Sequence, residues 1–214
     1  PTKYPQGSEK HMIKAVTGRE VPSGKLPADA GCAVFNVDSA ASFARAYKTG
    51  MPVIKRYITV AGEGIAVRKN LIVSIGTLFS EVIEFCGGYS EKTAKLIMGG
   101  PMMGVAQFTD KVPVIKTTSG LLVFTDEEAV TEETGSCIRC GRCIRACPMQ
   151  LEPCYMNRVA ADLEACDKYN MLDCIECGSC SYVCPARINL VAQFRVSKLK
   201  LGEKKRKAAA EAKA

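Results

Sequence analysis

CIRCGRCIRACP (Cys137–Pro148) and CIECGSCSYVCP (Cys174–Pro185) are the two stretches on which the fold and its chemistry depend. We call them block one and block two. Both have the spacing C-x2-C-x2-C-x3-C-P, and together they hold eight of the 12 cysteines of this 214-residue chain. A secreted disulfide scaffold spreads its cysteines along a short chain behind a signal peptide, whereas these cluster in a repeat. The pattern therefore predicts reduced thiolates that bind metal.

The spacing is that of ligand runs that hold [4Fe–4S] clusters in pairs. Three cysteines two residues apart form a tight loop, in which Gly141 and Gly178 let the backbone approach the cluster sulfur. The fourth cysteine, followed by Pro148 or Pro185 at the first helical position, ligates the other cluster. We expect cluster one to be bound by Cys137, Cys140, Cys143 and Cys184, and cluster two by Cys174, Cys177, Cys180 and Cys147.

The residues between the cysteines differ in charge. Arg139, Arg142 and Arg145 belong to block one, whereas Glu176 belongs to block two and Asp173 precedes it. Positive charge beside an anionic cluster favours the added electron. We therefore expect cluster one to have the higher reduction potential.

Four cysteines lie outside the blocks, in segments rich in apolar residues: Cys32, Cys86, Cys154 and Cys166. We expect them to be small packed side chains rather than ligands. The single histidine, His11, has no nucleophile pattern beside it, so a surface or packed side chain is expected.

The sequence predicts an α+β protein of several segments. Residues 1–52 are expected to be the end of an α/β domain, with a strand at Cys32–Val37 and a helix at Ser39–Gly50 capped by Ser39. Residues 53–125 are expected to form a β-grasp-like module around a helix at 77–88. Its strands are predicted at 53–60, 71–75, 95–100, 112–118 and 120–124. Residues 137–197 are expected to be a helical two-cluster domain, with helices at 149–173 and 188–201.

Charge marks the two remaining segments. Residues 126–136 carry five acidic and no basic side chains, which predicts a linker. Residues 198–214 are a basic tail, expected to be a solvated, fraying helix end.

Composition sets wider limits. A hydrophobic fraction of 47% at a net charge of +7 excludes a wholly disordered chain. No apolar run approaches the ~18 residues of a membrane span. The chain begins at Pro1 without a methionine, in sequence typical of a domain interior, so we expect a fragment of a longer protein.

With these features in place, the chain resembles the C-subunit family (RnfC, also called RsxC) of the Rnf ion-translocating ferredoxin:NAD oxidoreductases. YPQGSEKHMIKAVTGREVPSGKLPADAG (Tyr4–Gly31) is similar to the end of that family's flavin and NADH domain. IMGGPMMG (Ile97–Gly104) and KTTSGLLV (Lys116–Val123) are similar to its SLBB module. The two cysteine blocks are similar to its helical ferredoxin domain.

The resemblance implies an electron-transfer subunit that relays single electrons between NADH and flavin and the rest of a membrane complex. By match, Glu9 is a candidate for the nicotinamide side of the cofactor site and Asn36 for the flavin side. The family's flavin phosphate loop lies upstream of these residues, and we find no glycine-rich phosphate loop here. FMN and NADH are therefore expected only where the upstream domain is present, and this chain alone is expected to be an electron carrier.

The resemblance also implies other members of the complex as partners, no nucleic acid, and a peripheral position on the cytoplasmic face of the cell membrane. Two alternatives stay open. One is a soluble flavoprotein resembling the cobalamin reductases, which share this module order. The other is a non-redox metal-binding adaptor with structural zinc, although zinc would leave the third cysteine of each block and the repeated Cys-Pro unexplained.

Overall fold

A computed structural model of the chain describes residues 4–90, 93–130 and 133–211, which form two compact units. The sheet unit comprises Phe35–Thr131. The cysteine unit combines Pro1–Val34 with Glu132–Ala214 and holds both cysteine blocks. The units divide the predicted first segment near residue 34, and the segment boundaries proposed from the sequence stay predictions. Thr131 and Glu132 of the predicted linker lie outside the described residues.

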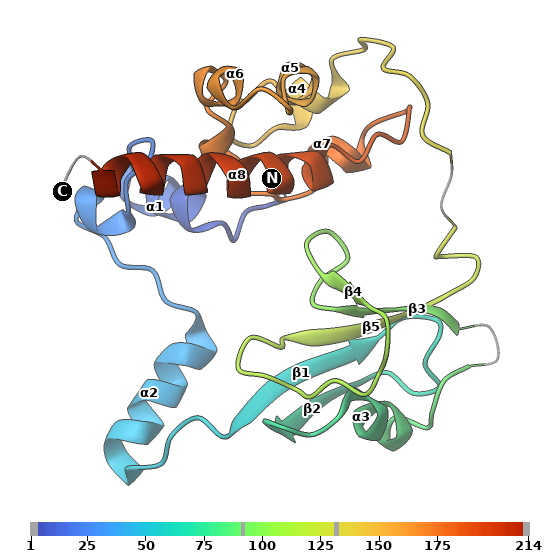
Figure 1. Cartoon of the computed structure of the whole chain (residues 1–214). Helices are drawn as coiled ribbons and strands as arrows, with labels where there is room; N and C mark the ends of the chain where they lie inside the picture. Colours follow the sequence, from blue (N-terminus) through green and yellow to red (C-terminus); the bar gives the residue numbers. More distant parts are fainter. Residues whose placement is uncertain (1–3, 91–92, 131–132, 212–214) are drawn as a thin grey trace. The chain divides into compact units, whose positions relative to one another are not determined.

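The sheet unit contains a five-stranded mixed sheet with a short helix beside it (Figure 1). Its elements are α2 (Val37–Thr49), β1 (Lys55–Ala61), β2 (Lys69–Ser74), α3 (Phe79–Phe85), β3 (Thr93–Met98), β4 (Val105–Gln107) and β5 (Gly120–Thr125). The strand order is β2-β1-β5-β3-β4. Strands β1 and β5 are parallel, and the other neighbouring pairs are antiparallel. The prediction of an α+β module is confirmed.

Alternating side chains give this sheet one apolar face. In β1, Ile58 and Val60 are buried while Tyr57 is exposed, as the two-residue period of a strand requires. Phe79 of α3 is fully buried in the same cluster. Gly62 follows β1 with a φ of 111°, and an added Cβ would lie 2.0 Å from the Val123 carbonyl oxygen. A glycine is therefore needed where the chain leaves β1 against β5.

The strand predicted at Cys32–Val37 is wrong. Residues 32–36 form a loop that leads into α2 at Val37, and no strand pairs with them in the described part of the chain. Asn36 rather than Ser39 caps α2, because its side-chain oxygen accepts a hydrogen bond from the Asp38 backbone N–H at 2.9 Å. Gly50 ends α2 in the left-handed conformation, as predicted.

The strand predicted at 112–118 is also wrong, and β4 was missed. The segment from Asp110 crosses the start of α3, where the Val112 carbonyl accepts from the Phe79 N–H at 2.9 Å. The Asp110 carbonyl accepts from the Ser80 N–H at 3.0 Å. N–H groups in the first turn of a helix have no acceptor inside the helix. The segment from Asp110 supplies those acceptors, so it caps α3 instead of joining the sheet.

The cysteine unit is helical. Its elements are α1 (Glu9–Thr17), the 3-10 turn η1 (Pro27–Ala30), α4 (Arg142–Ala146), α5 (Pro153–Arg158), α6 (Leu163–Lys168), the 3-10 turn η2 (Met171–Asp173), α7 (Ser179–Tyr182) and α8 (Leu190–Glu211). The helix predicted at 149–173 is broken into α5 and α6, because Asp162 caps a new helix by accepting from the Glu164 and Ala165 N–H groups.

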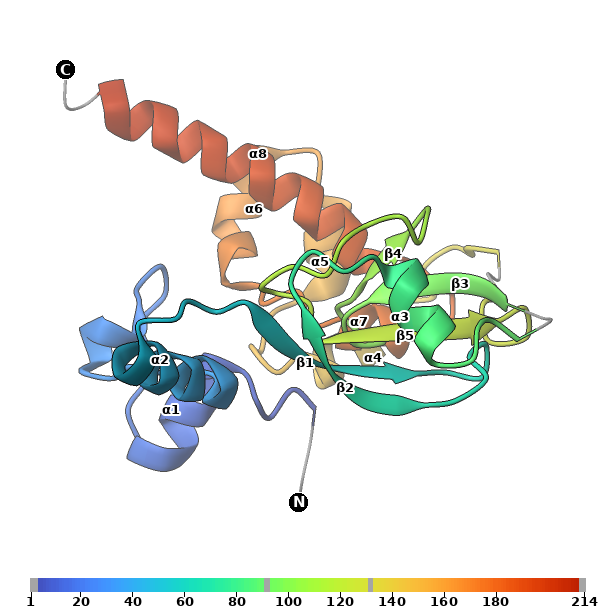
Figure 2. The same cartoon turned by 90° about the horizontal axis from the view of Figure 1, so that it is seen from below.

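Helix α8 organises this unit. It contacts α5, α6 and α7, and Figure 2 shows it as the long helix beside α5 and α6. Its buried side chains Leu190, Phe194 and Leu201 form one core with Met156 and Met171. The helix predicted at 188–201 therefore exists but extends through Glu211, into the predicted basic tail; residues 212–214 lie outside the described residues.

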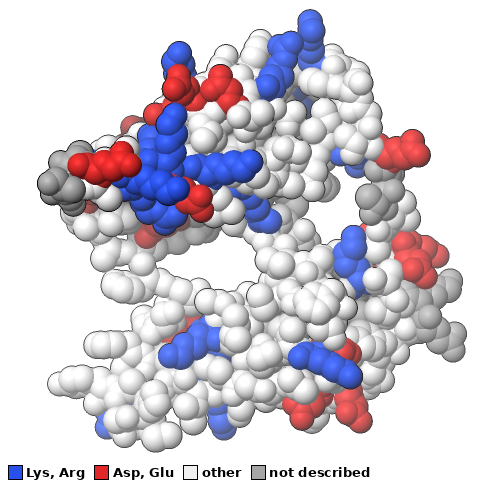
Figure 3. All heavy atoms as spheres, viewed as in Figure 1, with Lys and Arg blue, Asp and Glu red and all other residues white. Residues whose placement is uncertain are grey.

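The basic tail is partly neutralised by α6. Lys204 pairs with Glu164 at 3.6 Å, and Lys205 pairs with Asp167 at 2.5 Å. Lys and Arg side chains gather over the C-terminal part of α8, with acidic side chains beside them (Figure 3). These pairs continue the contact between α6 and α8 beyond the apolar core.

Candidate metal centres

Two cavities in the cysteine unit collect the eight block cysteines in two sets of four. Cavity one has a volume of about 260 Å³ and is lined by Cys137, Cys140, Cys143 and Cys184. Cavity two, of about 20 Å³, is lined by Cys174, Cys177, Cys180 and Cys147. Each cavity thus contains three cysteines of one block and the fourth cysteine of the other block.

The thiols of cavity two lie close enough to influence one another. Burial, followed by the nearby Cys174, Cys177 and Cys147, raises the pKa of the Cys180 thiol to about 12. Burial also raises the pKa of Cys174, and Cys147 adds to that shift. Cys147 therefore acts on thiols of the other block. Because iron binds the thiolate, metal binding here must displace protons that the metal-free site retains.

The two blocks fold into the same loop. Gly141 and Gly178 both adopt left-handed backbone conformations, with φ of 69° and 85°, and cap α4 and α7. Arg139 and Glu176 stand at equivalent positions and both have a φ of 56°. Glycine adopts the left-handed conformation without steric cost, which explains why both blocks have a glycine after their second cysteine.

Backbone N–H groups in or just after these loops donate to two of the cysteine sulfurs. The Leu151 N–H donates to Cys147 Sγ at 3.3 Å. The Glu176 N–H donates to Cys174 Sγ at 3.4 Å. Hydrogen bonds of this kind stabilise the thiolate and tune the reduction potential of a bound cluster.

The charges around cavity one are unpaired. Arg139, Arg142 and Arg158 line it, and within the described residues none of the three has an ion-pair partner. Arg139, Arg142 and Arg158 are all exposed. A cluster held by four thiolates is an anion, so these cations fit the charge of the group that the cysteines would bind.

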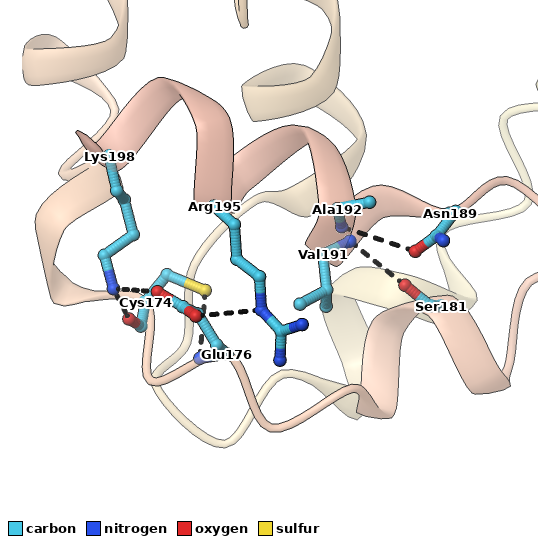
Figure 4. A network of polar contacts seen from close by, with 8 residues as sticks. All are labelled: Cys174, Glu176, Ser181, Asn189, Val191, Ala192, Arg195 and Lys198. Atoms are coloured by element: carbon cyan, nitrogen blue, oxygen red, sulfur yellow. Dashed lines mark hydrogen bonds and ion pairs between the residues drawn. The ribbon is translucent and has the colours of Figure 1, made fainter. Parts of the chain in front are cut away.

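The charge beside cavity two is held in a network on α8 (Figure 4). Glu176 Oε1 accepts from Lys198 Nζ at 2.6 Å, and Oε2 accepts from Arg195 Nε at 3.0 Å. Lys198 Nζ also donates to the Cys174 carbonyl at 2.7 Å. Burial alone would raise the pKa of Glu176, but the hydrogen bonds and charges of Lys198 and Arg195 outweigh it and lower that pKa. Two cations thus offset the negative charge of Glu176. The difference in charge between the surroundings of the two cavities is therefore smaller than the sequence of the blocks alone indicates.

The donor sets fit [4Fe–4S] clusters, which take four cysteine ligands each. Within the described ranges, no three His, Cys, Asp or Glu side chains converge on a point where a single metal ion could bind. A cluster does not need that convergence, because each thiolate binds a different iron atom.

Cavity one contains a fifth cysteine that the sequence analysis assigned to packing. Cys154, in the first turn of α5, lines the cavity together with Cys143. Burial, followed by Cys154, raises the pKa of Cys143 to about 11. No spacing signal identifies Cys154, because the turn between α4 and α5 brings it there.

The other cysteines outside the blocks behave differently from Cys154. Cys86 and Cys166 are fully buried, so the prediction of packed side chains is confirmed for them. Cys32 is partly buried, and its thiol donates to the Ala30 carbonyl at 3.5 Å.

Two residues near the N-terminus contact the blocks, and their sequence did not predict these contacts. The Tyr4 hydroxyl donates to the Cys177 carbonyl at 2.7 Å. His11 Nε2 lies 3.0 Å from the Pro148 carbonyl, so it is the donor of that hydrogen bond. Both partners are backbone carbonyls, which leave no sequence signal. His11 is therefore a packed histidine, one of the two outcomes expected for it.

The two cofactor-site candidates lie in different compact units. Glu9 is an exposed residue that begins α1. Asn36 caps α2. Each residue has a structural role at the start of a helix. The Asn36 side chain accepts from a first-turn N–H group, and the charge of Glu9 interacts favourably with the dipole of α1. Their assignment to a flavin and NADH site stays a prediction.

Three protein-family models match consecutive parts of the chain. A Nuo51 FMN-binding domain matches residues 1–45, an SLBB domain matches residues 57–106, and a 4Fe-4S dicluster domain matches residues 129–185. The third match contains both cysteine blocks. The chain therefore carries a two-cluster iron–sulfur domain.

The similar proteins described here are all named as C subunits of translocating oxidoreductase complexes. The chain is 50% identical over 210 residues to the C subunit of the Na(+)-translocating ferredoxin:NAD(+) oxidoreductase complex of Acetobacterium woodii, covering 96% of this chain and 47% of that protein. It is 48% identical over 206 residues to the C subunit of the ion-translocating oxidoreductase complex of Rhodobacter capsulatus, covering 95% and 40%. The corresponding protein of Methanosarcina acetivorans is 43% identical over 195 residues, covering 89% and 43%. The chain thus spans less than half the length of these three relatives.

Within the described ranges, no helix combines the length and the hydropathy of a membrane span. Helix α8 has sufficient length, but its many charged residues keep its hydropathy too low.

Proposed function

Because the chain belongs to the family of C subunits of ion-translocating oxidoreductase complexes, we propose that it is the electron-transfer part of such a protein. It relays single electrons between the NADH and flavin end of the full-length protein and the rest of the complex. The observation that carries this proposal is the collection of the block cysteines into two cavities, each completed from the other block. By itself the chain is an electron carrier within an oxidoreductase.

Each cavity holds one [4Fe–4S] cluster in this proposal. Cluster one is bound by Cys137, Cys140, Cys143 and Cys184, and cluster two by Cys174, Cys177, Cys180 and Cys147. When bound, such clusters supply one-electron storage at a potential that the surroundings set. Crossed ligation ties the two blocks together and keeps the two sites close, as a relay requires.

The surrounding residues orient the loops and stabilise negative charge. Lys198 and Arg195 hold Glu176, and Lys198 also fixes the Cys174 carbonyl, so α8 sets the conformation of the block-two loop. Arg139 and Arg142 place positive charge at cavity one. Added negative charge in either cavity is therefore met by nearby cations.

The flavin and NADH end is proposed from the match of residues 1–45 to an FMN-binding domain. Glu9 would lie on the nicotinamide side and Asn36 on the flavin side of that site in the full-length protein. The contacts of Tyr4 and His11 with the blocks support this order, because they join the flavin-like segment to the cluster region.

The partners we propose are the other subunits of the membrane complex, by the names of the relatives. The chain would lie on the cytoplasmic face of the membrane and be held there peripherally. We propose no nucleic acid partner.

The test is anaerobic purification, followed by iron and sulfide analysis and electron paramagnetic resonance (EPR) after dithionite reduction. Two clusters with four cysteine ligands each predict about eight iron and eight sulfide per chain. The reduced protein should give the spectrum of two magnetically coupled clusters. A colourless protein that contains zinc and no iron would overturn the proposal in favour of a structural metal domain.

A further inference from the structure

Cavity one has one more thiol than a cluster needs. Cys154 lines the cavity together with the four proposed ligands, whereas the lining of cavity two contains its four proposed ligands and no other cysteine of the described chain. Cys154 stands on a different element from all four, in the first turn of α5. The extra thiol is therefore a property of this site, not of the repeated blocks.

Cys154 influences one proposed ligand in particular, Cys143. Both residues line cavity one, and their thiols lie close enough for Cys154 to raise the pKa of Cys143. Cys143 is held by α4, and α4 contacts α5. A group that Cys143 binds is consequently within a small side-chain movement of Cys154.

Cavity one also has room and exposure that permit such a movement. Its volume is about 260 Å³, against about 20 Å³ for cavity two. Cys137 and Cys140 are exposed and Cys143 is half-buried, so water and oxidants reach this site. Exposed thiolates are the ones that oxidation removes first.

We propose that Cys154 is a reserve ligand of cluster one that replaces Cys143 when Cys143 is lost or displaced. This rests on the proposed function, since it requires a cluster in cavity one. In the exchange, the bond between iron and Cys143 Sγ breaks and a bond between iron and Cys154 Sγ forms. The proton of the Cys154 thiol passes to the released Cys143 thiolate or, where Cys143 has been lost, to water. No electron is gained or lost, so no oxidant or reductant is needed.

The experiment compares three variants of the full chain, purified anaerobically beside the unmodified protein: Cys143→Ala, Cys143→Ala/Cys154→Ser and Cys143→Ala/Cys32→Ser. Cys32 is a partly buried cysteine of the same unit that does not line either cavity. Iron, sulfide and the EPR spectrum after reduction are measured for each. Cluster two is an internal control for folding, because no variant removes its ligands.

Cys143→Ala and the Cys32 control should keep about eight iron per chain, while the Cys154 double variant should fall to about four. Equal iron loss in Cys143→Ala and in the Cys154 double variant would overturn the reserve role. If the unmodified protein lacks about eight iron, the proposed function fails instead, which separates the two claims.

Discussion

Cavity one and cavity two are built from the same repeated loop but lie in different surroundings. Cys137 and Cys140 of cavity one are exposed, whereas Cys177 and Cys180 of cavity two are each 7% exposed. The difference arises from the helices that come after each block in the chain. Block two leads into α8, whose Val191 and Phe194 line cavity two, while block one leads into short helices.

This contrast suggests different duties for two sites with the same ligand run. A surface site is suited to electron exchange with a partner, and a core site is suited to storage and relay. Burial and hydrogen bonding, rather than the cysteine spacing, then decide how each cluster behaves.

The largest effect should come from the core under cavity two. Phe194→Ala should lower the free energy of unfolding by about 3–5 kcal/mol, because Phe194 is 1% exposed in the core that joins α8 to α5 and α6. Leu199→Ala, on an exposed position of the same helix, should change it by less than about 0.5 kcal/mol. Anaerobic urea denaturation followed by circular dichroism measures both. Equal effects would mean that α8 is not anchored through this core.

A smaller effect is expected at the network beside cavity two. Lys198→Met removes the hydrogen bonds to Glu176 and to the Cys174 carbonyl, which should cost about 1–3 kcal/mol. It should also lower the reduction potential of cluster two, because one nearby cation is lost. Lys205→Met, which breaks a half-exposed pair with Asp167, serves as the control and should leave the potential unchanged. An unchanged potential in Lys198→Met would show that the network is only structural.

Burial should also separate the two sites in a chelator challenge. With a water-soluble iron chelator, about half of the iron should leave at least tenfold faster than the rest. A factor of ten corresponds to a free energy for opening the buried site that is about 1.4 kcal/mol higher than for the exposed site. The fast half should be cluster one, since its ligands are exposed. Iron release followed by absorbance and EPR tests this, and a single phase would remove the distinction between the sites.

The smallest effect concerns the arginines of block one. Changing Arg139, Arg142 and Arg145 together to Gln should lower the potential of cluster one relative to cluster two. Each exposed charge contributes less than about 1 kcal/mol. A potentiometric titration with EPR detection measures the separation, and the matched control is a triple Gln variant at Lys200, Lys204 and Lys207. An unchanged separation would contradict the charge argument made from the sequence.

The sequence was sufficient where a short repeated pattern determines geometry. Each cavity is lined by the four cysteines that the spacing grouped together, and the glycine of each block has a left-handed conformation in its loop. The strands predicted at 53–60 and 71–75 exist as Lys55–Ala61 and Lys69–Ser74, and alternation in the first buries Ile58 and Val60 and exposes Tyr57. In these cases the local pattern and the tertiary structure agree.

The sequence was insufficient where distant backbone decides the outcome. Cys32–Val37 has the composition of a strand but no partner strand in the described chain, so it is a loop. The segment at 112–118 is apolar, yet the Val112 carbonyl caps α3. Cys154 enters cavity one through the turn between α4 and α5, which no spacing rule anticipates. Helix α8 was predicted too short, because its last turns are charged and gain ion pairs with Glu164 and Asp167.

The central claim is that each cluster is held by cysteines from both blocks, and a pair of double variants tests it most directly. Cys137→Ala/Cys184→Ala removes two ligands of one proposed set, so about four iron per chain should remain. Cys137→Ala/Cys147→Ala removes one ligand from each set, so both clusters should be lost or damaged. The opposite order of iron contents would show that each block binds its own cluster, and would contradict the crossed relay.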